Sequence, residues 1–201
     1  MNDDRTRILL RLTKHQDPQV ALPDWRLDGV TFDDPVETFC QMVGAVGGQV
    51  QPAESIESIL ADPRFESLLP GPDRRVVSCL RGLPGSHSLE SIDDPRELNG
   101  LPVAWVEGKL GVAESGAVWI NEAAIDHRAA LFLAEHLVVV LSTTAIVHNL
   151  HQAYSQLQEW NEIGATPWGG FISGPSKTAD IEQYLVIGAQ GPRAHTVVLV
   201  D

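Results

Sequence analysis

Apolar and polar positions along this chain change period repeatedly, which predicts helices and strands in alternation. Helical spacing from Val36 to Val43, between Asp34 with Pro35 and a glycine pair, predicts one helix. The uninterrupted apolar run VVVL at 138–141 is typical of a strand covered on both faces. Strands are predicted at 47–53, 74–80, 102–108, 109–121, 136–142, 168–173 and 195–201, and further helices at 5–15, 55–62 (capped by Ser55), 143–160 and 178–189.

This alternation predicts an α/β fold of three layers around a mostly parallel sheet. We expect residues 34–201 to form one domain, and residues 1–33 to form an amino-terminal arm with a short helix. The stretch 80–102 is rich in Gly, Pro, Ser and Asp and predicts a long loop with one helical turn. Ligand sites in such sheets lie outside the carboxyl ends of the strands, so the loops that follow strands are the places to search.

The charge of the chain narrows the choice of partners. A formal net charge of −13, with no basic run, argues against nucleic-acid binding and against docking on anionic membranes. The first residues do not resemble a signal peptide, and no window approaches the roughly 18 apolar residues of a membrane span. We therefore expect a cytoplasmic protein without membrane insertion.

The first loop with candidate chemistry lies within FISGPSKTADIE at 171–182. A predicted strand leads through it into a predicted helix, where backbone N–H groups, hydroxyls and a lysine can bind an anion. It is not a Walker A loop, because Ser176 occupies the place of the glycine before Lys177. Asp180 and Glu182 already complement the helix dipole, so an ordinary capped helix start stays open beside the anion site. The candidate ligand-binding residues here are Gly174, Ser176, Lys177 and Thr178, with Ser173 as a further donor.

The second such loop is GVAESGAVWI at 111–120. Glu114 and Ser115 stand between two short apolar runs, with a glycine on each side. A carboxylate in such a kink at a strand end is a candidate general base or nucleophile. The alternative is a hairpin whose polar residues face water.

Cysteines and histidines give little support for a metal site. Cys40 and Cys79 are far apart, which argues against a disulfide framework and against an iron–sulfur or zinc site built on cysteines. His148 and His151 lie three apart on a predicted helix, but no HExxH pattern or matching acid accompanies them. His136 would lie at the amino end of its strand, away from the expected ligand edge. We expect neither a metal nor a cofactor in this chain.

Taken together, GVAESGAVWI, HLVVVL and ISGPSKTADIEQYLVIGAQGPRAHTVVLVD resemble the lactate-utilisation protein C family (LutC/YkgG, LUD domain) over about the last hundred residues. The resemblance implies a fold similar to the NagB/RpiA/CoA-transferase group. It also implies a bacterial, cytoplasmic role in oxidising L-lactate to pyruvate with two iron–sulfur partner proteins. Because this chain has only two cysteines, the electron-carrying centres are expected in the partners.

The resemblance favours an accessory, non-redox subunit that binds a small anionic ligand at the two loops. An alternative is a stand-alone enzyme that acts on a phosphorylated or CoA-linked metabolite with Lys177 and Glu114. In CoA transferases of similar fold a glutamate attacks the thioester, and Glu114 is the tempting counterpart, although fold alone does not transfer function. A third possibility is a structural or regulatory module whose loops only cap helices.

Overall fold

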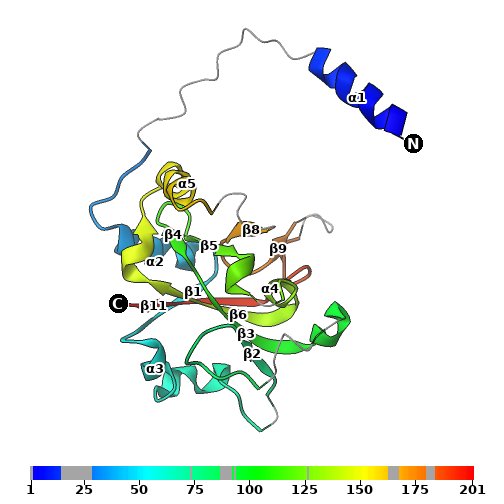
Figure 1. The fold of residues 1–201 in the computed structure, drawn as a ribbon. Helices are drawn as coiled ribbons and strands as arrows, with labels where there is room; N and C mark the ends of the chain where they lie inside the picture. The colour runs from blue at the N-terminus through cyan, green and yellow to red at the C-terminus, as the bar shows by residue number, and fades with distance from the viewer. Residues whose placement is uncertain are drawn as a thin grey trace.

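A parallel sheet of five strands, in the order β1-β11-β6-β3-β2, is the centre of the domain (Figure 1). The computed structural model describes residues 2–14, 29–72, 74–86, 92, 94–125, 127–162, 168–179 and 184–201. The strands are β1 (Gln49–Ala53), β11 (Ala194–Val200), β6 (Ala134–Ser142), β3 (Leu101–Glu107) and β2 (Val76–Ser78). The predicted α/β fold with a mostly parallel sheet is confirmed.

A second, four-stranded sheet covers one face of the central sheet. Its order is β7 (Ile146–Val147), β4 (Leu110–Val112), β5 (Ala117–Asn121) and β8 (Gly169–Ile172). Val118 and Ile120 of β5 share a buried core with Val139 of β6, so the two sheets pack directly on each other. Helix α5 (Leu150–Glu159) packs on the outer side of this sheet through Ala153 and Leu157.

Helices complete the layers on both faces of the central sheet. Helix α2 (Pro35–Ala45) buries Phe39 and Val43 in the core between the two sheets. On the opposite face, α3 (Ile56–Ile59) and the 3-10 helix η1 (Pro63–Leu68) bury Ile59 and Phe65 against β6 and β3. The remaining helices are α1 (Asn2–Lys14), α4 (Ala130–Leu133), η2 (Pro95–Leu98), η3 (Glu122–Ala124) and η4 (Thr143–Ala145).

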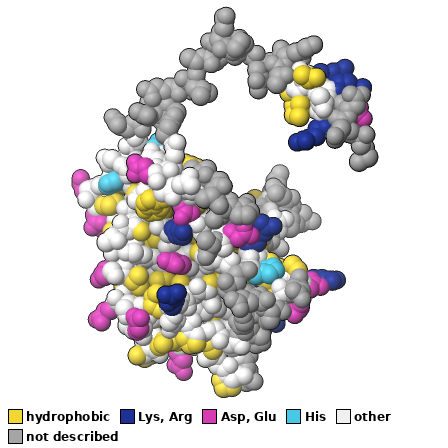
Figure 2. Space-filling model, viewed as in Figure 1, with side chains coloured by type: hydrophobic (Ala, Val, Ile, Leu, Met, Phe, Trp, Pro, Cys, Tyr) yellow, Lys and Arg dark blue, Asp and Glu magenta, His cyan; other side chains and the backbone are white. Residues whose placement is uncertain are grey.

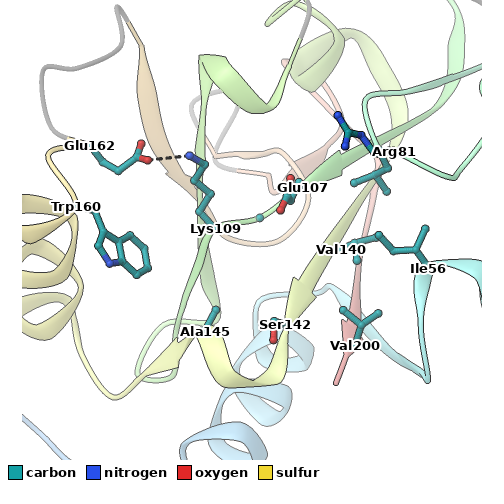
Figure 3. A pocket seen from close by; sticks show the side chains of 12 residues that line it. Ile56, Arg81, Glu107, Lys109, Val140, Ser142, Ala145, Trp160, Glu162 and Val200 are labelled. Carbon is teal, nitrogen blue, oxygen red and sulfur yellow. Dashed lines mark hydrogen bonds and ion pairs between the residues drawn. The ribbon is translucent and has the colours of Figure 1, made fainter.

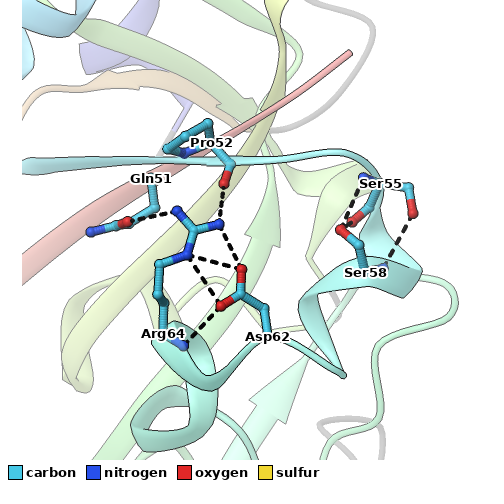
Figure 4. Close-up of polar contacts among 6 residues, drawn as sticks. All are labelled: Gln51, Pro52, Ser55, Ser58, Asp62 and Arg64. Carbon is cyan, nitrogen blue, oxygen red and sulfur yellow. Dashed lines mark hydrogen bonds and ion pairs between the residues drawn. The ribbon is translucent and has the colours of Figure 1, made fainter.

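Local hydrogen bonds fix the helix starts that the sequence predicts. The Asp34 carboxylate accepts the Glu37 N–H at 2.9 Å, and Ser55 and Ser58 form a reciprocal capping box (Figure 4). In the same region, Arg64 pairs with Asp62 and donates to the Pro52 carbonyl at 2.9 Å (Figure 4). These contacts attach η1 to the end of β1.

Helix α1 stands apart from the domain in Figure 1. It confirms the helix predicted at 5–15, and its apolar Ile8 and Leu12 are 57% and 60% exposed. In Figure 2 its basic side chains are separate from the domain surface, over which acidic side chains are spread. The turn-rich segment predicted after it lies almost wholly outside the described residues. None of the helices in the described ranges is long and apolar enough to cross a membrane.

Two predicted elements have different bounds in the structure. The helix predicted at 143–160 begins only at Leu150, because Asn149 caps it and the β-branched residues before it form η4 and β7. The strand predicted at 109–121 is two antiparallel strands, β4 and β5, joined by a turn at 113–116. The Glu114 loop is therefore a hairpin turn, but its polar side chains do not simply face water, because the Ser115 hydroxyl is buried and Glu114 accepts the Leu150 N–H.

The helix predicted at 178–189 is wrong. Its described ends form an antiparallel pair, β9 (Lys177–Thr178) with β10 (Val186–Ile187), and residues 180–183 lie outside the described part. The Ser176 carbonyl accepts the Gly188 N–H at 2.9 Å, and Gly188 has a φ of 78°. Antiparallel pairing of two short strands that contain the β-branched residues Thr178, Val186 and Ile187 thus overrides the helical spacing of the apolar positions.

We predict that Gly116→Ala destabilises the domain. Gly116 has a φ of 61°, and an added Cβ would lie 2.7 Å from the Val43 backbone nitrogen in α2. Strain and overpacking together should lower the free energy of unfolding by about 2 kcal/mol or more in urea titrations. Gly44→Ala is the matched control, because a Cβ there meets open space within α2 and should raise stability by up to about 1 kcal/mol. Equal effects of the two substitutions would contradict this account.

Candidate functional site

The two loops singled out by the sequence lie against each other. The Ser173 hydroxyl donates to the Ser115 carbonyl at 2.8 Å. Both loops also pack on α2, since a Cβ at Gly116 would meet Val43 and a Cβ at Gly174 would meet the Val46 carbonyl. We call this region, made of residues 113–116 and 173–178 against the end of α2, the loop junction. The two loops therefore contact each other in the fold.

The loop junction is at the edge of the sheet opposite to the expected one. The Ser176 N–H donates to the Pro192 carbonyl at 2.9 Å, directly before β11 begins. The Arg193 N–H donates to the carbonyl of Glu135, at the start of β6, at 2.8 Å. The lysine loop therefore lies at the amino ends of the parallel strands. Because the following helix is absent over the described residues, the helix-dipole argument for an anion no longer applies.

The charged residues of the loop junction bind backbone groups. Glu114 accepts the N–H of Leu150, the first residue of α5, at 2.8 Å. The Lys177 ammonium donates to the carbonyl of Val46, at the end of α2. Both contacts are of the kind that satisfies helix ends. Thr178 lies in β9, and the Ser115 hydroxyl is buried with no hydrogen-bond partner among the described residues.

Two histidines lie near the amino ends of the central strands. His195 is 2% exposed, and neither ring nitrogen has a hydrogen-bond partner in the described part of the chain. Burial, with a smaller effect of the His136 charge, lowers its pKa to about 4, so the ring is neutral at pH 7. His136 lies within hydrogen-bonding distance of Thr196, 2.8 Å between Nε2 and Oγ1, and burial also lowers its pKa. Both histidines are therefore packed within the central sheet, His136 in β6 and His195 in β11.

The other histidines and the acids do not gather around a common point. His148 accepts the Phe32 N–H at 3.0 Å through Nδ1, and His151 is exposed on α5. Over the described ranges, no group of three or more His, Cys, Asp or Glu side chains is placed to hold a metal ion.

A pocket of about 590 Å³ opens at the carboxyl ends of the parallel strands (Figure 3). We call it the carboxyl-edge pocket. Residues after β2, β3 and β6 line it, together with α3, the end of β11 and the segment after α5. Its polar side chains are Arg81, Glu107, Lys109, Ser142 and Glu162, with Trp160 on one side.

The turn from β3 into β4 places two of these side chains. A Cβ at Gly108 would overlap Val118 and lie 2.9 Å from Cγ1 of Val139, so only glycine fits this close approach of backbone to core. The Gly108 N–H donates to the Val140 carbonyl at 2.8 Å. Glu107 and Lys109 on either side are thereby fixed at the rim of the sheet, and Figure 3 shows them in the pocket.

An ion pair defines one wall of the pocket. Lys109 Nζ lies 2.8 Å from Glu162 Oε1, and the Asn121 amide donates to Oε2 of the same carboxylate. The hydrogen bond from Lys109, followed by that from Asn121, holds the pKa of Glu162 below its usual value. Arg81 and Glu107, by contrast, form no ion pair within 4.0 Å with another described residue.

Sequence reasoning missed this pocket. Its available signal was the pair of charged residues, Glu107 and Lys109, directly after the apolar strand VAWV. Arg81 and Glu162 gave no signal of their own, because each belongs to a loop far away in sequence.

Similarity to known proteins shows the family of this chain. The model of the LUD domain family matches residues 97–200, more than half of the 201 residues. The chain belongs to the LUD domain family. The matched range contains every strand from β3 to β11. It also contains the two loops of the loop junction and the turn at 107–109 that lines the pocket.

Several curated proteins are similar to this LUD domain protein. Lactate utilization protein C from Bacillus pumilus is 37% identical over 92 residues, 45% of this chain and 38% of that protein. Lactate utilization protein C 1 from Bacillus mycoides is 23% identical over 198 residues, 89% of this chain and 85% of that protein. Uncharacterized protein YkgG from Escherichia coli is 31% identical over 101 residues, 49% of this chain and 44% of that protein. Against the first and the third of these, the chain spans only about two fifths of the relative's length.

A solved structure supports the fold. The crystal structure of a DUF162 family protein from Deinococcus radiodurans superposes with a TM-score of 0.61 at 16% identity, over 86% of this chain and all of that chain. This likeness concerns the fold alone.

We predict that Glu162→Gln destabilises the LUD domain in a pH-dependent way. The Glu162 side chain is 16% exposed, and its lowered pKa means that the carboxylate stabilises the fold above its unfolded pKa of about 4.3. That contribution is lost as the pH falls through the lower folded value. Urea titrations should show a loss of about 1 kcal/mol at pH 7 that shrinks below about pH 4.

Glu159→Gln is the matched control for this substitution. Glu159 is exposed at the end of α5 and has no ion pair with another described residue, so its loss should change stability by less than about 0.5 kcal/mol. A Glu162→Gln effect that stays constant down to pH 3 would count against the ion pair as its source.

Proposed function

We propose that this LUD domain protein is an accessory, non-redox subunit of a bacterial L-lactate utilisation system, in which iron–sulfur proteins are its partners. The observation that carries the proposal is the family match over 97–200, together with relatives named Lactate utilization protein C. The range 97–200 that the family model matches contains β3, β6 and β11 of the central sheet, the two loops of the loop junction and most of the residues that line the pocket.

The sulfur chemistry of the chain supports a non-redox role. A cysteine-ligated iron–sulfur cluster takes four thiolates, and this sequence has two cysteines. Cys40 lies in α2 and Cys79 directly follows β2, on different elements of the domain. Burial raises the pKa of the Cys40 thiol, which disfavours the thiolate that a metal requires. Electron transfer is therefore assigned to the partners.

A small anionic ligand is part of the proposal, and two places compete for it. At the loop junction, Glu114, Ser115, Gly174, Ser176, Lys177 and Thr178 remain candidate ligand-binding residues. Their charged members, however, already bind backbone groups at helix ends. The carboxyl-edge pocket has open volume and side chains that are not committed in this way, which favours it.

The second candidate function is a stand-alone enzyme on a phosphorylated or CoA-linked metabolite. The observation in its favour is the position of the charged pocket at the carboxyl ends of parallel strands, where α/β enzymes place their sites. Glu114 is a less suitable nucleophile for it, because Oε1 accepts the Leu150 N–H. We prefer the accessory role.

A deletion and co-purification experiment tests the proposal. Deleting the gene in the native host should abolish or slow growth on L-lactate, whereas growth on pyruvate should be normal. The tagged chain should co-purify under gentle conditions with proteins whose visible absorption and iron content indicate iron–sulfur clusters. Normal growth on lactate, together with a tagged chain that purifies without such partners, would refute the accessory role.

A further inference from the structure

We infer that the carboxyl-edge pocket binds a mononucleotide-type anion, with its phosphate at Arg81, its ribose hydroxyls at Glu107 and its planar base against Trp160. This inference deepens the proposed function and rests on it, because it names the class and the place of the small anionic ligand.

The pocket has the position and the size of a nucleotide site. The sheet ends at Glu107 in β3, Ser142 in β6 and Val200 in β11, and all three residues line the pocket. Nucleotide sites of open parallel sheets lie at this edge, outside the carboxyl ends of the strands. A volume of about 590 Å³ lies within the usual range for ligand pockets and is several times what lactate would fill.

The charged groups of the pocket differ in how far they are committed. Lys109 and Glu162 neutralise each other at 2.8 Å and form a fixed wall. Arg81 forms no ion pair with another described residue, so its guanidinium is available to an incoming phosphate, for which its geometry is suited.

Glu107 lies between Arg81 and Lys109 in Figure 3, with its carboxylate on the pocket side. A carboxylate repels a second anion but accepts hydrogen bonds from hydroxyl groups. A ligand that satisfies both Arg81 and Glu107 must therefore carry an anion and, a short distance away, hydroxyl donors. Phosphate and ribose stand in this relation in a nucleotide.

The remaining walls suit an apolar, planar group. Trp160 is 45% exposed at the end of α5 and faces the pocket in Figure 3. Ala145 supplies apolar surface below it, and Val140 and Val200 line the opposite side of the pocket beside Ile56. Base–indole stacking is favourable and tolerates any base, because every base has a π face.

A fragment series measured by isothermal titration calorimetry on the full chain tests the assignment. The probes are AMP, adenosine, ribose 5-phosphate and L-lactate. AMP should bind most tightly, and both fragments should bind more weakly than AMP. Arg81→Ala should weaken AMP about tenfold or more while leaving adenosine unchanged, and Arg81→Lys should restore part of the loss. Trp160→Ala should weaken AMP and adenosine but not ribose 5-phosphate.

Arg96→Ala is the matched control, because it removes an exposed arginine that lies in neither site and should leave AMP binding unchanged. Lys177→Ala tests the competing site, because it removes the cation of the loop junction. The inference is overturned if AMP does not bind, if L-lactate binds more tightly than AMP, or if AMP binding is lost in Lys177→Ala and kept in Arg81→Ala. AMP binding by a protein whose deletion leaves lactate growth normal would refute the proposed function and keep the pocket. Impaired growth of the deletion strain on lactate, without AMP binding by the protein, would keep the proposed function and refute the nucleotide site.

Discussion

The burial of β6 on both faces is the constraint on which the rest of the domain depends. Its odd-numbered residues Leu137, Val139 and Leu141 pack toward α2 and the second sheet, and Val138 and Val140 pack toward α3 and η1. Neighbouring strands β11 and β3 pair with it in parallel along most of its length. Parallel strands are joined by crossover connections, which cover the two faces of the sheet with helices and the second sheet. Only the amino ends and the carboxyl ends of the strands are then left for function.

The two edges have different physical characters. At the amino ends of the strands, hydrogen bonds and glycines with positive φ close the loop junction against α2. At the carboxyl edge, the chain leaves β3 through Gly108 and leaves β6 through η4, and the diverging loops enclose the pocket. The loop junction is closed by these contacts, whereas the pocket at the carboxyl ends is open and lies where ligand sites of parallel sheets are generally found.

The elements that local patterns specify were predictable, and those that depend on pairing or packing with other segments were not. The run VVVL correctly predicted β6, and Asp34 with Pro35 correctly predicted the start of α2. The stretch after Lys177 has helical spacing, yet β10 pairs with β9, which spacing alone cannot reveal. The family signature located the loop junction, but the edge on which it lies depends on contacts with Pro192 and α2. The pocket needed Arg81, Glu107 and Glu162 together, and no local pattern links these three.

The central claim is that the carboxyl-edge pocket, and not the loop junction, receives the ligand. Amide chemical-shift mapping by NMR on the full 201-residue chain during titration with AMP tests it most directly. The account predicts that the shifted amides cluster at Arg81, at 107–109 and at 160–162, with the Trp160 indole N–H shifted as well. Shifts concentrated at 113–116 and 173–178, with the pocket amides unchanged, would contradict it.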